Sequence, residues 1–233
     1  VVPTQRFEVR VAWGEFHGEP PQASKANDFA ELLLQEWSLY PPQLVERTRL
    51  RRIVLCQRLQ AGDEDRGALP DFDHDDLYYD VDNGDYDRTY QRKVVHHEFF
   101  HIIDERDDGH LYDDPRWARL NTRAWRYGSG GSAQASRTED ASMLTDRIPG
   151  AITRYCTAGI EEDKAEVFAN LIVEADAVER IAARDPVVCA KVTRMQELLA
   201  AFAPAVDASF WAAARAVAPT AIFGGPCRAA PAR

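Results

Sequence analysis

The sequence lacks any apolar run near the roughly 20 residues that a membrane-spanning helix needs, although 45% of its 233 residues are hydrophobic. It also lacks an excess of positive charge, since 28 Lys and Arg face 38 Asp and Glu, for a net charge of −10. Because recognition of phosphates needs a basic surface, this balance argues against a nucleic-acid partner. The composition favours a soluble protein with one substantial core or two subdomains.

Cysteine is sparse and scattered, at Cys56, Cys156, Cys189 and Cys227. No Cys-x-x-Cys pair is present, which argues against a cysteine zinc site. Two disulfides and four thiols are both compatible with the spacing. The first residue is Val rather than Met, as after removal of an N-terminal segment. The compartment is left open with a slight preference for export, and the oligomeric state is left open too.

Hydrophobic periodicity separates an N-terminal part with strands from a C-terminal part with helices only. Alternation predicts strands at residues 7–13, 52–56 and 77–81. Helical spacing predicts one helix from the N-cap Ser24 to about residue 39, stopped by Pro41 and Pro42, and another over residues 88–106. Further helices are predicted over residues 161–184, 186–202 and 207–216.

This order of elements predicts the α+β class. We expect a single catalytic domain, residues 1–233, in which a small mixed sheet and an active-site helix form an N-terminal lobe over about residues 1–106. A mostly helical lobe over about residues 107–217 and a tail over residues 218–233 would follow, with a cleft between the two lobes.

The stretch VVHHEFFHIID, residues 94–104, places several titratable side chains among large apolar ones in a predicted helix. His97 and His101 stand four apart, so both rings project from one face and can reach one zinc at about 2.0–2.1 Å. Glu98 lies about 100° further around the helix, outside the ligand set but close enough to act as a base on the attacking water. His96 is out of register and is interpreted as a hydrogen-bonded core histidine.

A catalytic zinc needs a third protein ligand, and the sequence offers more than one. Asp107 would complete a layout that requires Gly where Asp104 stands, which argues against it. Glu162 and Glu166 share one face of the predicted helix that begins near residue 161, and like charges at this spacing gain from a cation. Glu166 is favoured, because its neighbours are apolar, while Glu162 and Asp107 stay open as alternatives.

Three blocks of the sequence, HEFFHIID (residues 97–104), AITRY (151–155) and EEDKAEVFA (161–169), carry a resemblance. Together they resemble zincin metallopeptidases of the HExxH-plus-Glu type, a gluzincin-like arrangement found in zinc-binding metallopeptidases of bacteria. A more distant similarity is to the catalytic domain of anthrax lethal factor. The match covers roughly residues 77–172, and Tyr155 lies further from Glu166 than it does in lethal factor.

The resemblance implies a zincin-like fold and a role for each matched residue. His97, His101 and Glu166 would bind Zn2+, and Glu98 would be the catalytic base. Tyr155 would donate a hydrogen bond to the reacting carbonyl. Asp104 would orient a ligand histidine. With Glu166 as the ligand, the shared helix face would place Glu162 beside the ligands. The strand at residues 77–81 would be an edge strand along which a peptide substrate pairs.

These expectations predict a zinc-dependent peptide-bond hydrolase, an endopeptidase acting on a peptide or protein substrate. Two other readings stay open. One is a zinc-binding, protease-like module that binds a partner without catalysis, and the other is a helical interaction protein without a metal. Substrate and cleavage preference are not predicted.

Overall fold

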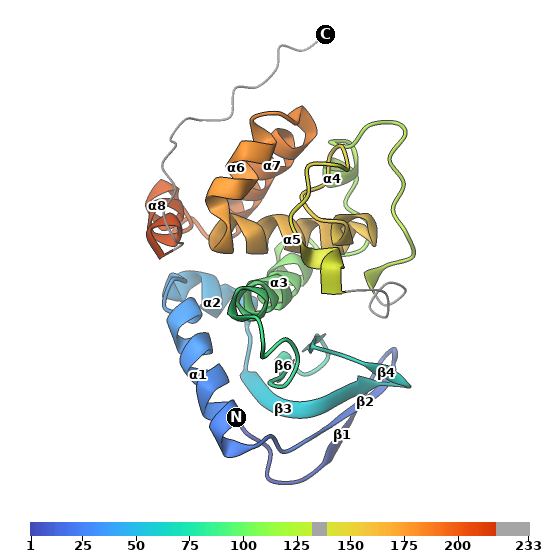
Figure 1. Cartoon of the computed structure of the whole chain (residues 1–233), viewed down its shortest axis with the longest axis vertical. Coiled ribbons are helices and arrows are strands. Elements are labelled where there is room, and N and C mark those ends of the chain that lie inside the picture. The colour runs from blue at the N-terminus through green and yellow to red at the C-terminus, as the bar shows by residue number, and fades with distance from the viewer. Residues whose placement is uncertain (132–138, 218–233) are drawn as a thin grey trace. The chain divides into compact units, whose positions relative to one another are not determined.

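The computed structural model describes residues 1–131 and 139–217. The predicted tail, residues 218–233, lies outside the described residues, as does Cys227. The chain divides into two compact units, Val1–Arg106 and Asp107–Arg233 (Figure 1). Each unit has its own set of elements, and they are described in turn.

A mixed sheet forms the floor of the first unit. Its strand order is β1-β2-β3-β6-β5, with β4 paired to β3. β3 and β6 run parallel, and the other pairs are antiparallel. The strands are β1 (Phe7–Val11), β2 (Gly14–Glu19), β3 (Arg52–Ala61), β4 (Glu64–Asp65), β5 (Ala68–Asp71) and β6 (Asp76–Asp80).

The position of β6 corrects one expectation. The strand predicted at residues 77–81 was expected at a sheet edge, but β6 lies between β3 and β5 and pairs with both. Its five residues are all buried, as expected for a strand with neighbours on both sides and a helix layer above. Of the strands in this path, β1 and β5 form the edges.

The helices of the first unit are α1 (Ala23–Trp37), α2 (Pro42–Thr48) and α3 (Arg88–Asp107). Ser24 was predicted as an N-cap, but α1 begins one residue before it and has no side-chain cap. Pro42 was predicted to stop the preceding helix, and it follows the end of α1. It also begins α2, because the first turn of a helix tolerates its missing N–H and fixed φ. Asp87 caps α3 by accepting from the N–H groups of Thr89 and Tyr90 at 2.9 and 3.1 Å.

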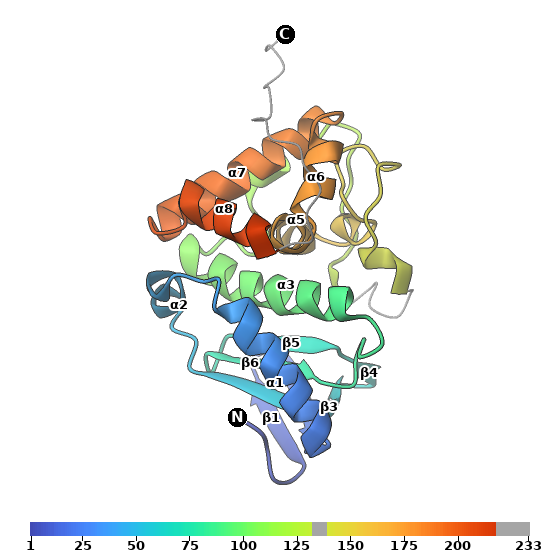
Figure 2. The ribbon, with the colours of Figure 1, turned by 60° about the vertical axis from the view of Figure 1, so that its left-hand side comes forward.

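Both ribbon views show α1 running beside β3 (Figures 1 and 2). On this side of the sheet Phe29 of α1 packs against Tyr79 of β6, with ring centroids 5.4 Å apart. Another buried cluster draws its residues from β2, β3, β5 and β6, among them Phe16, Leu59 and Tyr78. Both faces of the central strands are therefore covered.

The second unit is helical in its described part. Its elements are α4 (Pro115–Ala118), η2 (Glu139–Ser142), η3 (Tyr155–Thr157), α5 (Ile160–Val173), α6 (Ala175–Ala182), α7 (Pro186–Phe202) and α8 (Ala208–Val217). The single helix predicted over residues 161–184 is divided into α5 and α6 at Glu174, whose φ of −133° and ψ of 41° are not helical. α5 contacts α6, α7, α8 and η3 (Figure 2), and every one of its residues is buried.

The structure therefore has a mixed α+β fold with a small mixed sheet, as predicted from the order of elements. The zincin-like topology and the cleft stay predictions. No helix in the described ranges is both long enough and apolar enough to cross a membrane.

Candidate metal centre

The histidine pair lies on one face of α3. His97 and His101 are buried, and their Nε2 atoms lie 3.2 Å apart, with ring centroids separated by 4.9 Å. The same helix buries Val95, Phe99 and Ile103 completely. Apolar packing thus fixes the helix, and the four-residue spacing turns two imidazole nitrogens toward one point.

His96 belongs to a separate buried network, which confirms its interpretation as a hydrogen-bonded core histidine. Its Nε2 lies 2.9 Å from Glu36 Oε2, and its Nδ1 lies 2.5 Å from the Tyr40 hydroxyl. Arg92 donates to both oxygens of Glu36, at 2.7 and 3.1 Å. Burial lowers the pKa of His96, although Glu36 opposes this effect. A neutral ring that donates to Glu36 and accepts from Tyr40 satisfies both contacts.

Glu98 and Asp104 differ in their surroundings on α3. Glu98 is half-buried, and its charge adds to burial in raising the pKa of Tyr79, whose hydroxyl donates to the Val95 carbonyl at 3.0 Å. Asp104 is fully buried. The roles of Glu98 as a base and of Asp104 in orienting a histidine stay predictions.

The start of α5 is a buried acidic turn in the second unit. Glu161, Glu162 and Asp163 occupy its first turn, where the helix dipole favours negative charge. Asp163 Oδ2 accepts from Trp117 Nε1 at 2.9 Å and from the Tyr127 hydroxyl at 2.7 Å, and it pairs with Lys191 Nζ at 2.6 Å. This network fixes the residue that follows Glu162.

A glycine segment lies against the same turn. The N–H groups of Gly128 and Gly130 donate to the carbonyls of Thr157 and Ala158, each at 2.9 Å. A Cβ atom added at Gly131 would overlap the Glu162 carboxylate and lie 2.6 Å from the Tyr155 hydroxyl. The absence of a side chain at Gly131 therefore makes room for both groups, and the structure brings Tyr155 next to Glu162. No local sequence pattern predicts this role of Gly131.

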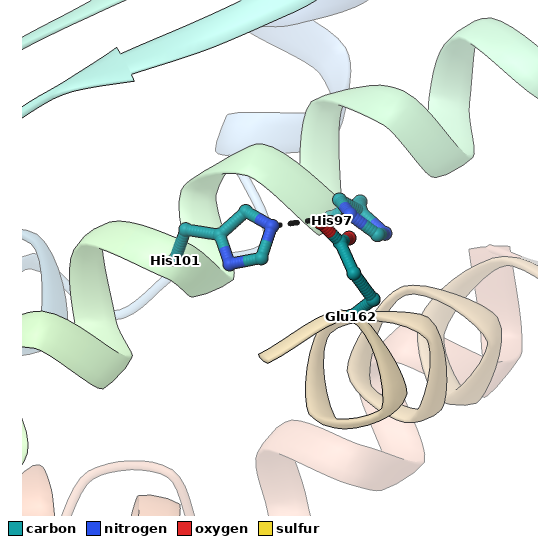
Figure 3. A group of neighbouring side chains, drawn as sticks. All are labelled: His97, His101 and Glu162. Atoms are coloured by element: carbon teal, nitrogen blue, oxygen red, sulfur yellow. Dashed lines mark hydrogen bonds between the residues drawn. The ribbon is translucent and has the colours of Figure 1, made fainter. Parts of the chain in front are cut away.

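His97, His101 and Glu162 form a group that could hold a metal ion (Figure 3). Each residue offers one ligand atom, these atoms all lie within 4.8 Å of one another, and all three residues are buried. The group contains Glu162, where the sequence favoured Glu166, which lies one turn further along α5. Asp107, the other alternative, is not a member of this group. Among the described residues, this is the one group of its kind. The assignment of Glu166 stays a prediction that variants can decide.

The donor set fits a divalent metal. Two imidazoles and one carboxylate are a combination that catalytic zinc sites use, with one position left for water. Burying such groups close together is costly unless they are paired or bound to metal. The chemistry of the three side chains therefore agrees with the predicted cofactor class, while the identity of the ion rests on experiment.

Cysteine takes no part in this group. Cys56 and Cys156 are buried free thiols, so the predicted alternative of disulfides does not apply to them. Burial raises the pKa of Cys56 to about 12 and also raises that of Cys156. Both side chains are therefore unreactive core residues at neutral pH.

No protein-family model, curated protein or solved structure matches this chain. The function is therefore inferred from the residues of the metal group and from the motif resemblance.

Proposed function

We propose that this chain is a zinc-dependent peptide-bond hydrolase, an endopeptidase in which His97, His101 and Glu162 hold the ion. The observation that carries the proposal is the buried group of two histidines and one glutamate, together with Glu98 next to one of the histidines in the chain. The substrate class comes from the resemblance of the motifs to zincin metallopeptidases.

Each residue would have a distinct task. Neutral His97 and His101 and the Glu162 carboxylate would bind the ion. When bound, zinc would supply Lewis acidity, which lowers the pKa of a coordinated water to about 7 and polarises a carbonyl. Glu98 would accept a proton as water attacks the scissile carbonyl and would then give it to the leaving amine. The Tyr155 hydroxyl would donate a hydrogen bond to the carbonyl oxygen as negative charge develops on it.

The proposal is tested by zinc stoichiometry and by cleavage of a peptide library, measured on the wild type and on Glu98→Gln. The variant should bind zinc as the wild type does but cleave about 100- to 10,000-fold more slowly, because only the proton transfer is lost. Glu105→Gln, on the same helix but outside the group, is the matched control and should keep the wild-type rate.

Three outcomes would contradict the proposal. Undiminished cleavage by Glu98→Gln would exclude Glu98 as the base. Zinc binding by a wild type that cleaves no peptide would favour the non-catalytic binding module. A wild type purified without chelator that contains no metal would favour the helical interaction protein.

A further inference from the structure

A large groove lies within the second unit. No residue of the metal group lines it. Its volume is about 1260 Å3, and it is lined by the turn after η2, the C-terminal part of α6 and the start of α7. Four arginines line it: Arg147, Arg154, Arg180 and Arg184. We call it the arginine groove.

The wall of the arginine groove is held by specific bonds. Leu144 forms a bridge with Thr153, and the Thr145 N–H donates to the Ile152 carbonyl at 2.7 Å. At the tip of this turn, Gly150 donates its N–H to Asp185 Oδ2, and its carbonyl accepts from Lys191 Nζ, both at 2.6 Å. The turn is thus tied to the N-cap and to the body of α7 through the N–H and the carbonyl of Gly150, so a ligand would meet a preformed wall.

The four arginines are exposed, and none has a side-chain hydrogen bond or ion pair with another described residue. The acids near them are largely engaged elsewhere. Asp185 accepts from N–H groups of α7 and from Gly150, and Glu179, the neighbour of Arg180 in the chain, pairs with Arg215. Asp146 also lines the groove, which leaves the cations in excess there.

Such a cluster is unexpected in a chain with a net charge of −10. Arg180 lies in the last turn of α6, and Arg184 follows two residues after the end of that helix, so both belong to the same wall of the groove. Elsewhere in the described part, Arg52 and Arg92 pair with buried carboxylates. Exposed guanidinium groups that line one groove suit carboxylates, which they bind through paired N–H donors.

The rest of the lining decides what kind of anion fits. Leu144, Ile148 and Ile181 add apolar surface between the arginines. The volume exceeds the roughly 300–1,000 Å3 of pockets for small molecules. A nucleic acid would be repelled by the net negative charge of the protein. We propose that the arginine groove binds an extended acidic peptide segment, whose carboxylates pair with the arginines and whose aliphatic side chains pack between them.

This site shares no residue with the metal group, so its test does not depend on hydrolysis. The probe is a fluorescein-labelled peptide of Glu-Leu-Glu-Ser repeats, and its matched control has Gln-Leu-Gln-Ser repeats. Binding is followed by fluorescence anisotropy with full-length Glu98→Gln protein, so that hydrolysis cannot remove the probe. The glutamate peptide should bind at least about tenfold more tightly than the glutamine peptide.

Variants then locate the site. Arg180→Gln with Arg184→Gln should weaken binding by about fivefold or more, because two charge-assisted contacts are lost. Arg119→Gln with Arg123→Gln removes the same charge from exposed positions of the same unit outside the groove and should leave the affinity within about twofold. Arg147→Gln with Arg154→Gln tests the other wall and serves if the first pair fails to fold.

The proposal is overturned by any of several results. The glutamate peptide could show no saturable binding, or the glutamine peptide could bind as tightly. The control pair could weaken binding as much as the groove pairs do. Inorganic phosphate could displace the probe at concentrations at which the peptide itself half-saturates, which would identify a site for a small anion instead.

Discussion

His96, the residue before His97, belongs to a buried polar network in the first unit. Asp163, the residue after Glu162, belongs to a buried polar network in the second unit. In the first unit, both oxygens of Glu36 are engaged, by Arg92 and by His96. In the second unit, Oδ2 of Asp163 takes Lys191, Trp117 and Tyr127 together, and Oδ1 has no hydrogen-bond partner among the described residues. Each network fixes the neighbour of a candidate ligand, but the two networks stabilise their buried carboxylates in different ways.

The difference concerns what remains when one cation is removed. Burial alone would raise the pKa of Glu36, but hydrogen bonds from His96 and Arg92 hold it below its usual value. Two independent donors therefore stabilise that carboxylate. Asp163 and Lys191 are both buried completely, so removal of the lysine leaves the carboxylate out of reach of water, whereas Arg92 is partly exposed and its removal would let water approach Glu36. The α5 network should be the more sensitive of the two.

Lys191→Met should give the largest change in stability. It leaves the Asp163 carboxylate buried without a cation, which is expected to lower the free energy of unfolding by about 3–5 kcal/mol. Arg92→Met should lower it by about 1–3 kcal/mol, since His96 still contacts Glu36. Urea denaturation of the two variants measures both values.

The double variant Lys191→Met with Asp163→Asn is the control for this comparison. It removes the uncompensated charge and should recover much of the lost stability. If Arg92→Met is as damaging as Lys191→Met, the two networks are equivalent and the contrast drawn between them is wrong.

The ligand on α5 is decided by a pair of matched variants. Glu162→Gln should weaken zinc binding by more than about 100-fold, because it removes a ligand and not only a supporting hydrogen bond. Glu166→Gln, one turn away on the same face, should keep stoichiometric zinc. Elemental analysis and competition with a chromogenic chelator measure both affinities, and the reverse result would assign Glu166 as the sequence predicted.

The two helices also show what the sequence could predict. His97 and His101 both lie on α3, so the 3.6-residue period of one helix is enough to predict that their rings lie together. The structure confirms this. On α5, Glu162 and Glu166 have the same period and similar chemistry. Which of them joins the histidines depends on tertiary packing, which no local pattern contains.

The same limit explains the differences in the fold. Alternation located β3 and β6 but could not order them in a sheet, and the edge position that the resemblance implied for residues 77–81 is wrong. Helical periodicity continues from α5 into α6, and the break at Glu174 carries no Gly or Pro that would signal it.

Gly131→Ala should have a smaller effect, confined to the α5 side of the comparison. The added Cβ would collide with the Glu162 carboxylate and approach the Tyr155 hydroxyl, so zinc affinity should fall by about tenfold as these side chains shift. Gly109→Ala is the control, since its φ of +74° strains the backbone but no atom lies within 4 Å of the added Cβ. Equal zinc affinities in the two variants would exclude a positioning role for Gly131.

The smallest expected effect lies at the end of α3, where burial and the neighbouring Asp108 raise the pKa of Asp107 from 3.8 to about 6. The folded state thus binds this proton more tightly than the unfolded state does. The resulting stabilisation is complete below pH 3.8 and is lost as the pH rises through 6. Above that pH, Asp107→Asn should therefore be more stable than the wild type by about 1 kcal/mol, a value reduced for solvent screening of a partly exposed group. Near pH 3.8 the wild type and the variant should have equal free energies of unfolding.

Urea denaturation at both pH values measures the difference in free energy of unfolding between Asp107→Asn and the wild type. Asp113→Asn, at an exposed position of the same unit, is the control. A stabilisation independent of pH would show that Asp107 acts through its shape and hydrogen bonds and not through its charge.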